Sequence, residues 1–132
     1  MSANKVILLV DDELIILESL KIQIQNLILN EQVIIEVASS GEEAKELIHD
    51  FVNDNFDLQL VISDYNLEDM LGTEILSETQ LLYPNAIGAI LTGQPDFTFS
   101  EDANLGENFR NIIDKPWSYE ELSVMISKAL SK

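Results

Sequence analysis

Three carboxylates, a hydroxyl and a lysine each stand close behind one of five short apolar runs in the sequence. Asp11 and Asp12 follow the first run, and Asp64 follows the third. Thr92 and Lys115 follow the fourth and the fifth. Carboxylate oxygens are the ligands that Mg²⁺ prefers, and a carboxylate can act as a nucleophile toward phosphorus. These residue types indicate metal-assisted phosphoryl transfer, provided that the fold brings them together.

Charge repulsion limits what a cluster of acids can do on its own. Two carboxylates ~4 Å apart repel by about 4 kcal/mol at an effective dielectric constant of about 20, so the cluster must take up protons, a cation or the Lys115 ammonium. An all-oxygen set of ligands suits Mg²⁺. The cation, Lys115 and the Thr92 hydroxyl would then face the charge on a transferring phosphoryl group. A single acid behind a strand more often caps a helix, and only the convergence of all five groups favours a site.

The apolar runs alternate with longer stretches of helical periodicity. Strands are expected at residues 6–10, 33–37, 58–62, 86–91 and 111–113. Helices are expected at residues 13–29, 41–53, 73–82 and from a capping box at Ser118 and Glu121 to about Leu130. This alternation predicts an α/β fold whose parallel strands all end at one edge, where such sheets bind ligands. Between residues 94 and 109, Pro95 and Gly106 weaken a helix, so a fourth helix is expected to be short or irregular.

Composition excludes several classes of function. The 132 residues hold 24 acids and 7 bases, a formal charge of −17, which disfavours binding to nucleic acids or anionic membranes. Cysteine is absent and histidine occurs once, which excludes disulfides, thiol catalysis and a His-rich zinc site. Because the longest early apolar run has five residues, neither a signal peptide nor a membrane span is expected. We therefore expect one cytoplasmic domain.

Four motifs in this order resemble the receiver domain of two-component response regulators, the CheY-like family. They are VDDE at 10–13, SDYNLEDMLG at 63–72, LTG at 91–93 and DKPW at 114–117. The resemblance implies a flavodoxin-like five-stranded parallel sheet, order 2-1-3-4-5, flanked by five helices. It also implies a single receiver domain over residues 1–132, with its core at about 5–130.

The resemblance assigns a metal site around the phosphoacceptor. Asp64 is identified as the phosphoacceptor and as a ligand of Mg²⁺. Asp12 would bind the metal directly and Asp11 through water. Asn66, two residues after the acceptor, would offer its backbone carbonyl. Gly72 resembles the family's glycine behind the acceptor loop, where little room is left for a Cβ atom.

The resemblance also assigns the groups that respond to the phosphoryl group. Thr92 would donate its hydroxyl to it, and Lys115 would pair first with Asp64 and then with a phosphoryl oxygen. The Lys115–Pro116 peptide is expected to be cis. Ile112 stands where the family usually has Tyr or Phe, so we expect the switch to be read out through residues 93–109 instead.

The implied function is a phosphorelay receiver with self-catalysed phosphotransfer and autodephosphorylation only. Its phosphodonor would be a histidine kinase or a histidine phosphotransfer protein, and its output an unknown domain or protein. The family commonly docks the donor near the first helix. Five further apolar residues there are expected to lie mostly in the core, with Ile16 as a contact for the donor; they are Ile15, Ile16, Ile22, Ile28 and Leu29.

Two other functions stay open. A phosphorylation-independent interaction module, a pseudo-receiver, would need none of the pocket chemistry, although such proteins usually lose a pocket residue. A phosphatase of the haloacid dehalogenase type also uses an aspartate behind a strand, but it needs a second aspartate two residues on as general acid. Asn66 occupies that position and cannot serve, so this reading ranks lowest.

Overall fold

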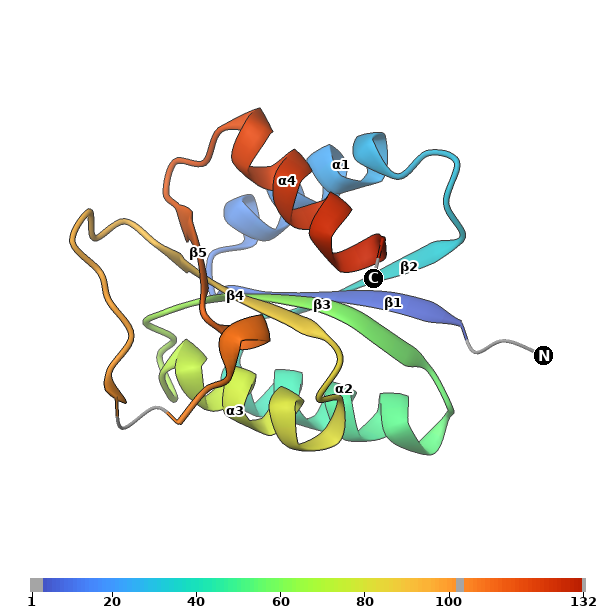
Figure 1. Ribbon diagram of the computed structural model, residues 1–132, viewed down its shortest axis with the longest axis horizontal. Helices are drawn as coiled ribbons and strands as arrows, with labels where there is room; N and C mark the ends of the chain where they lie inside the picture. The colour runs from blue at the N-terminus through green and yellow to red at the C-terminus, as the bar shows by residue number, and fades with distance from the viewer. Residues whose placement is uncertain (1–3, 102–103, 132) are drawn as a thin grey trace.

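One parallel sheet forms the centre of the molecule. In the computed structural model, which describes residues 4–101 and 104–131, five strands pair in parallel in the order β2-β1-β3-β4-β5 (Figure 1). The strands are β1 Lys5–Val10, β2 Val33–Ala38, β3 Asp57–Asp64, β4 Ile87–Thr92 and β5 Asn111–Asp114. The expected strand order is confirmed, and each expected strand is present with bounds shifted by at most a few residues.

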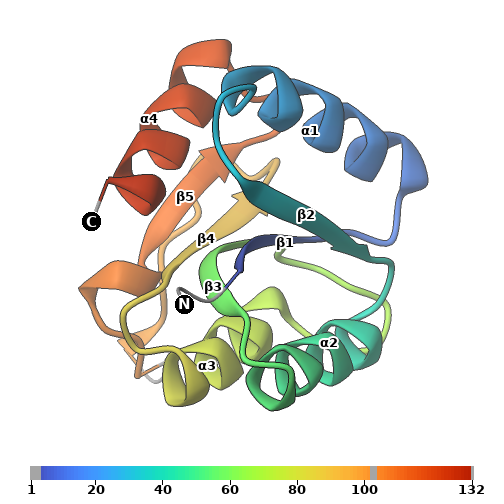
Figure 2. The same cartoon turned by 90° about the vertical axis from the view of Figure 1, so that its right-hand side faces the viewer.

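Helices cover both faces of the sheet. They are α1 Leu14–Leu27, α2 Gly41–Asn53, α3 Gly72–Leu82 and α4 Tyr119–Leu130. Figure 2 shows α1 and α4 on one face and α2 and α3 on the other. The expected capping box forms at α4, where the Ser118 hydroxyl accepts from Glu121 N–H and the Glu121 carboxylate accepts from Ser118 N–H. Within the described residues, none of the helices combines the length and the apolar character that crossing a membrane requires.

The central strands are buried on both faces, which explains their unbroken apolar runs. Ile7 and Leu9 of β1 pack toward α1 and α4, whereas Val6 and Leu8 pack toward α2 and α3. Alternate side chains of a strand point to opposite faces, so a strand between two helical layers needs apolar residues at every position. The two cores hold the strands rigidly and so fix where their carboxyl ends lie.

The fourth of the five expected helices is not an α-helix. Between β4 and β5, the described residues 93–101 and 104–110 contain the single-turn 3-10 helix η2, Glu107–Phe109, and no α-helix. Asn104 has a φ of 55°, which interrupts any helix there. Phe109 instead holds the segment to the core, since a Cβ atom on Gly88 would lie 2.6 Å from its ring. The prediction of an irregular segment is confirmed, and the count of five helices is wrong.

The apolar excess on α1 is mostly exposed, which corrects the expectation that it packs in the core. Only one stripe of this helix, Leu17, Leu20 and Ile24, is buried within its bounds. Ile15 is 80% exposed and Leu29 is 77% exposed, and Ile22 is also exposed. Ile28 is buried, as expected, and Ile16 is half-buried. A straight helix on a sheet presents one face to it, so apolar residues on the other side have nothing to pack against.

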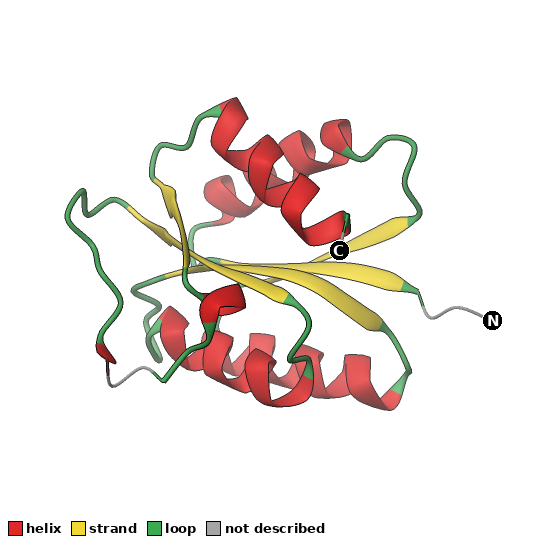
Figure 3. Cartoon of the chain, viewed as in Figure 1, coloured by secondary structure: helices red, strands yellow, loops and turns green. Residues whose placement is uncertain are grey.

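The carboxyl ends of the strands meet at the edge of the sheet that lies away from the N-terminus. Figure 3 shows the loops behind β3 and β4 at this edge. Val10 pairs with Ser63, and Asp64 pairs with Leu91, so the residues that follow β1, β3 and β4 are brought side by side. This register places Asp11, Asp12 and Asp64 in one region.

Candidate functional site

A lysine joins two carboxylates at this edge of the sheet. Lys115 Nζ lies 3.0 Å from Asp64 Oδ1 and 3.1 Å from Asp11 Oδ2. Asp64 ends β3, Asp11 follows β1, and Lys115 follows β5, so three segments far apart in the sequence contribute. The main-chain N–H of Lys115 donates to the Thr92 carbonyl at 2.9 Å, which ties the loop behind β5 to the end of β4. The convergence expected of Asp11, Asp64 and Lys115 is present in the structure.

Thr92 lies at the end of β4 and is 4% exposed. Its hydroxyl oxygen accepts a hydrogen bond from the Gln94 N–H at 3.1 Å. The Lys115–Pro116 peptide is cis, as the resemblance implies. The threonine hydroxyl is therefore engaged with the segment behind β4, so any movement of this hydroxyl also releases or shifts Gln94.

Burial and the contact between Asp64 and Lys115 act in opposite directions on the pKa of each of these two groups. Burial raises the pKa of the Asp64 carboxyl, and the hydrogen bond from Lys115 offsets this only in part. The neighbouring charges of Asp11 and Asp12 raise it further. Burial lowers the pKa of the Lys115 ammonium, but the attraction of the Asp64 and Asp11 carboxylates outweighs that effect and the pKa is raised. One cation thus serves more than one buried acid, which leaves the site short of positive charge.

The acids behind β1 fit a divalent cation. Asp11 is fully buried, and its Oδ1 accepts from the Glu13 N–H at 2.9 Å. Among the described residues, its Oδ2 accepts no hydrogen bond of good geometry and forms an ion pair with the Lys115 ammonium. Asp12 Oδ2 accepts from the Glu68 N–H at 3.2 Å. Carboxylate oxygens of Asp11, Asp12 and Glu13 lie within 4.8 Å of one another. A buried carboxylate oxygen that must share its lysine with a second acid, in an all-oxygen cluster, suits Mg²⁺.

The cluster differs in part from the ligands expected from the sequence. Asp11 and Asp12 are in it, whereas Asp64 is held by Lys115 and Asn66 is exposed, its main chain bridging to Leu71. Sequence reasoning missed Glu13, although it follows the two aspartates directly, because its place at the start of a helix explained it. The metal roles of Asp64 and Asn66 stay predictions.

Main-chain bonds hold the acceptor loop, residues 65–71, in place. The Tyr65 N–H donates to the Leu91 carbonyl at 3.0 Å, and the Gly72 N–H donates to the Tyr65 carbonyl at 2.7 Å. A Cβ atom on Gly72 would lie 2.2 Å from the Asp64 carbonyl oxygen, so only glycine fits there. The expectation of little room at Gly72 is confirmed, and the close approach keeps Asp64 next to the start of α3.

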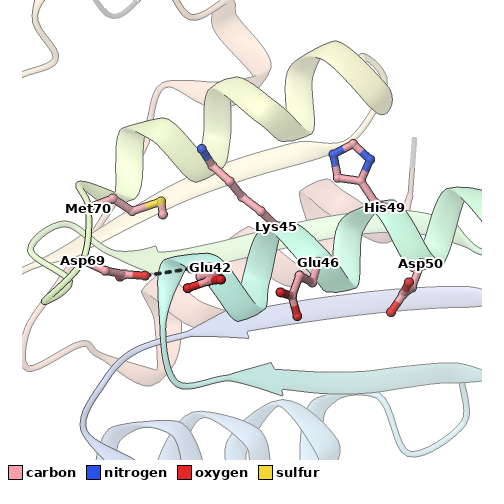
Figure 4. A pocket seen from close by; sticks show the side chains of 7 residues that line it. All are labelled: Glu42, Lys45, Glu46, His49, Asp50, Asp69 and Met70. Carbon is pink, nitrogen blue, oxygen red and sulfur yellow. Dashed lines mark hydrogen bonds between the residues drawn. The ribbon is translucent and has the colours of Figure 1, made fainter.

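The same loop is clamped to the start of α2. The Asp69 carboxylate accepts from the N–H groups of Gly41 and Glu42, each at 2.9 Å, and Met70 packs where Gly41 has no side chain (Figure 4). A groove of about 520 Å³ runs beside the clamp and is lined by Glu42, Lys45, Glu46, His49, Asp50, Asp69 and Met70. An anion at the amino end of a helix is stabilised by the free N–H groups there. The clamp links the loop that follows Asp64 to α2, which lies on the opposite side of the sheet from α1.

We expect the Asp69→Asn variant to be less stable than the wild type near neutral pH and to lose that difference in acid. The bonds to Gly41 and Glu42 lower the pKa of the Asp69 carboxyl. A lowered folded-state pKa adds stability above the ordinary aspartate pKa of about 3.9, and this stability disappears as the pH falls through the lower folded-state value. Urea unfolding of both proteins from about pH 6 to about pH 3 measures it. A difference that grows in acid would contradict the assignment.

An aromatic cluster ties the segment behind β4 to the residue next to Asp64. The rings of Tyr65 and Phe97 pack edge-on with centroids 4.7 Å apart, and Phe97 packs on Phe99 at 5.3 Å. The Phe97 N–H donates to the Gln94 carbonyl at 3.2 Å. The sequence drew attention to Phe97 and Phe99 as rings that could fill the space left by an irregular helix, but not to Tyr65, which is distant in the chain and shares no motif with them.

A second groove lies beside Lys115, on the α1 face. It measures about 490 Å³ and is lined by Ile16, Ser19, Gln23, Lys115, Pro116 and Trp117. The Trp117 indole N–H donates to the Gln23 side-chain carbonyl at 2.9 Å, which joins the loop behind β5 to α1. The groove therefore offers apolar contact area directly next to the acidic site.

The chain is similar to solved structures along nearly its whole length. The response regulator protein TrrA from Thermotoga maritima, solved in complex with Mg²⁺-BeF, is 30% identical over 96% of this chain and 99% of its own, with a TM-score of 0.72. An uncharacterized protein from Neptuniibacter caesariensis is 29% identical over 99% of this chain and 90% of its own, with a TM-score of 0.75. The signal receiver domain of an HD domain-containing protein from Pseudomonas fluorescens Pf-5 is 27% identical over 99% of this chain and 90% of its own, with a TM-score of 0.72.

A family model gives the same assignment from the sequence. A search of curated proteins finds no match. The model of the response regulator receiver domain matches residues 7–127. That range includes the ends of all the strands at which the acidic site forms. With this sheet order and these neighbours, the chain belongs to the response regulator receiver domain family.

Proposed function

We propose that this chain is a phosphorelay receiver in which Asp64 accepts a phosphoryl group in a Mg²⁺-dependent reaction. One observation carries the proposal: the Lys115 ammonium is shared between Asp64 and the buried Asp11, whose second oxygen has no other partner in the part of the chain that the structure describes. A site so short of positive charge is suited to take up a cation and then an anionic donor. We further propose that residues 1–132 form a single receiver domain with its core at about 5–130.

The transfer needs a nucleophile and groups that face the phosphoryl oxygens. An Asp64 carboxylate oxygen forms the new bond to phosphorus, while the bond from phosphorus to the donor's imidazole nitrogen breaks and its electron pair stays on that nitrogen. Lys115, already 3.0 Å from Asp64, is placed to pair with a phosphoryl oxygen. Thr92 would exchange its bond with Gln94 for a bond to the phosphoryl group. Mg²⁺, when held by Asp11 and Asp12, would supply further positive charge beside these oxygens.

Labelling with a small phosphodonor tests this function. Acetyl phosphate with Mg²⁺ should place one phosphoryl group on the peptide that contains Asp64, and a chelator should prevent it. Mass spectrometry of the digested protein locates the label. Label on another residue, or equal labelling in the presence of chelator, would overturn the proposal.

The groove beside Lys115 suits the docking of a phosphohistidine donor. Ile16 and Trp117 line it, and Ile15 on the same helix is 80% exposed, so apolar area is open next to the acceptor. Exposed apolar patches of this kind mark contact sites. We propose a histidine kinase or a histidine phosphotransfer protein as the partner here, an output domain or protein elsewhere, and a cytoplasmic location.

We expect activation to change amide exchange most in residues 93–109. A phosphoryl group adds roughly −1.5 to −2 charges, which gives Thr92 reason to turn and release Gln94. Phe97 then shifts with Gln94, since its N–H bonds to the Gln94 carbonyl. Hydrogen exchange with and without beryllofluoride and Mg²⁺ measures this, and a response confined to another face would contradict it.

The Ile112→Ala variant tests whether phosphorylation of Asp64 depends on the side chain that stands where the family usually has an aromatic residue. Ile112 is 38% exposed and makes no contact that the reaction requires, so labelling of Asp64 should stay within about twofold of the wild type. A folded Ile112→Ala protein that no longer accepts label would show that the two are coupled.

A further inference from the structure

A polar pocket lies at the edge of the sheet opposite the acidic site. It measures about 670 Å³ and is formed by the amino ends of β1, β3 and β4, by η2 and by the last turn of α4. Gln59 and Ile87 are its buried members. The five steps along the strand from Gln59 to Asp64 span roughly 16 Å, so the pocket is separate from the phosphoacceptor.

Gln59 is an unexplained polar residue in a buried strand. It interrupts the apolar residues Leu58 and Leu60, sits where the pairing of β1 with β3 shifts register, and is 6% exposed. Its side-chain N–H donates to the Asp57 carbonyl at 3.5 Å, and its side-chain carbonyl accepts no hydrogen bond from the described residues. Because this carbonyl is not sealed off from solvent, it is open to a donor inside the pocket, and a ligand with a hydroxyl or amine could supply that donor.

Two lysines of the pocket are also without acidic partners. Among residues 4–101 and 104–131, no carboxylate lies within 4.0 Å of Lys5 or Lys128, although the chain holds 24 acids. Lys128 donates to the Asn111 side-chain carbonyl at 2.7 Å. Asp57 is the one acid that lines the pocket, so the pocket carries a net positive charge within a strongly acidic protein.

We propose that this pocket binds a small organic anion that also carries a hydroxyl or amine. The carboxylate or phosphate of the ligand pairs with Lys5 and Lys128, and its hydroxyl or amine donates to the free carbonyl of Gln59. The side-chain amides of Asn85 and Asn108 supply further hydrogen bonds at the rim. The volume lies within the range of small-molecule sites in proteins.

Paired probes test both halves of the proposed recognition. Malate and succinate differ by one hydroxyl, and glycerol 3-phosphate replaces the carboxylates with a phosphate. Titration in the absence of Mg²⁺, followed by NMR amide shifts, should show saturable binding of malate or glycerol 3-phosphate with a Kd below about 1 mM, with shifts at residues 57–59 and 85–87. Malate should bind about fivefold more tightly than succinate if one net hydrogen bond to Gln59 forms.

Substitutions in the pocket test whether Lys5, Lys128 and Gln59 bind the ligand. The double variant Lys5→Met, Lys128→Met should weaken binding about tenfold or more, and Gln59→Leu should remove the preference for malate over succinate. The double variant Lys21→Met, Lys45→Met, on α1 and α2, is the matched control, since it also removes two lysine charges but none from this pocket, and it should leave the Kd unchanged. Absence of saturable binding by all three probes, shifts centred on Lys115, or equal loss in the control would overturn the proposal.

Discussion

The Asp64→Asn variant should incorporate no phosphoryl group from acetyl phosphate, whatever the Mg²⁺ concentration. The amide has nearly the same size as the carboxylate and can still accept a bond from Lys115, but it lacks the charged oxygen that attacks phosphorus. Labelled phosphate retained by the purified protein, measured over time against the wild type, gives the result directly.

A variant in the same loop serves as the control. Asp69→Asn removes an equal charge five residues from the acceptor, on a side chain that contacts α2 and not Lys115. It should label at a rate within about threefold of the wild type. Full labelling of Asp64→Asn would place the acceptor elsewhere. A wild-type protein that never labels would favour the pseudo-receiver.

The Lys115→Met variant should lose about 10²–10³-fold in the rate of phosphoryl transfer, the size found when one charged or hydrogen-bonding group facing a transition state is removed. It should also be less stable than the wild type, because Asp11 and Asp64 are left buried without their shared cation. Added Mg²⁺ should restore more stability to the variant than it adds to the wild type, since a bound ion stabilises the folded state and the variant has the larger deficit of positive charge.

Urea unfolding with Mg²⁺ and with chelator measures the loss of stability and its recovery by the ion, and labelling with acetyl phosphate measures the transfer rate. Lys21→Met again removes a lysine without touching the acidic site, and it should respond to Mg²⁺ as the wild type does. Equal stabilisation of Lys115→Met and the wild type by Mg²⁺ would show that the lysine does not compensate these acids.

The regular elements could be predicted because their signals are local. Five apolar runs marked the strands, and the capping box of Ser118 and Glu121 marked the start of α4. Burial on both faces leaves a parallel strand no place for polar residues, so its sequence is unmistakable. The positions of Asp11 and Asp64 followed, because parallel strands bring their carboxyl ends to one edge.

The expectations that failed depend on contacts between distant segments. The irregular course of the stretch behind β4 was expected from Pro95 and Gly106, whereas the contacts of Phe109 with Gly88 and of Phe97 with Tyr65 were not, since no local pattern shows them. Ile15 and Leu29 look like core residues by type, yet the sheet meets only one side of α1. The clamp from Asp69 to Gly41 joins residues 28 positions apart.

The sequence by itself determined the fold class, the strand order through its family motifs, and the residues gathered at the acidic edge. Only the tertiary structure decided that Lys115 is shared by Asp11 and Asp64. It also decided that, within the described residues, one oxygen of Asp11 has Lys115 as its sole partner and the two lysines in the pocket of Gln59 have no carboxylate within 4.0 Å. The physical reason is that apolar periodicity is a property of neighbours along the chain. Charge compensation and hydrogen-bond satisfaction depend on atoms that meet only after the chain has folded.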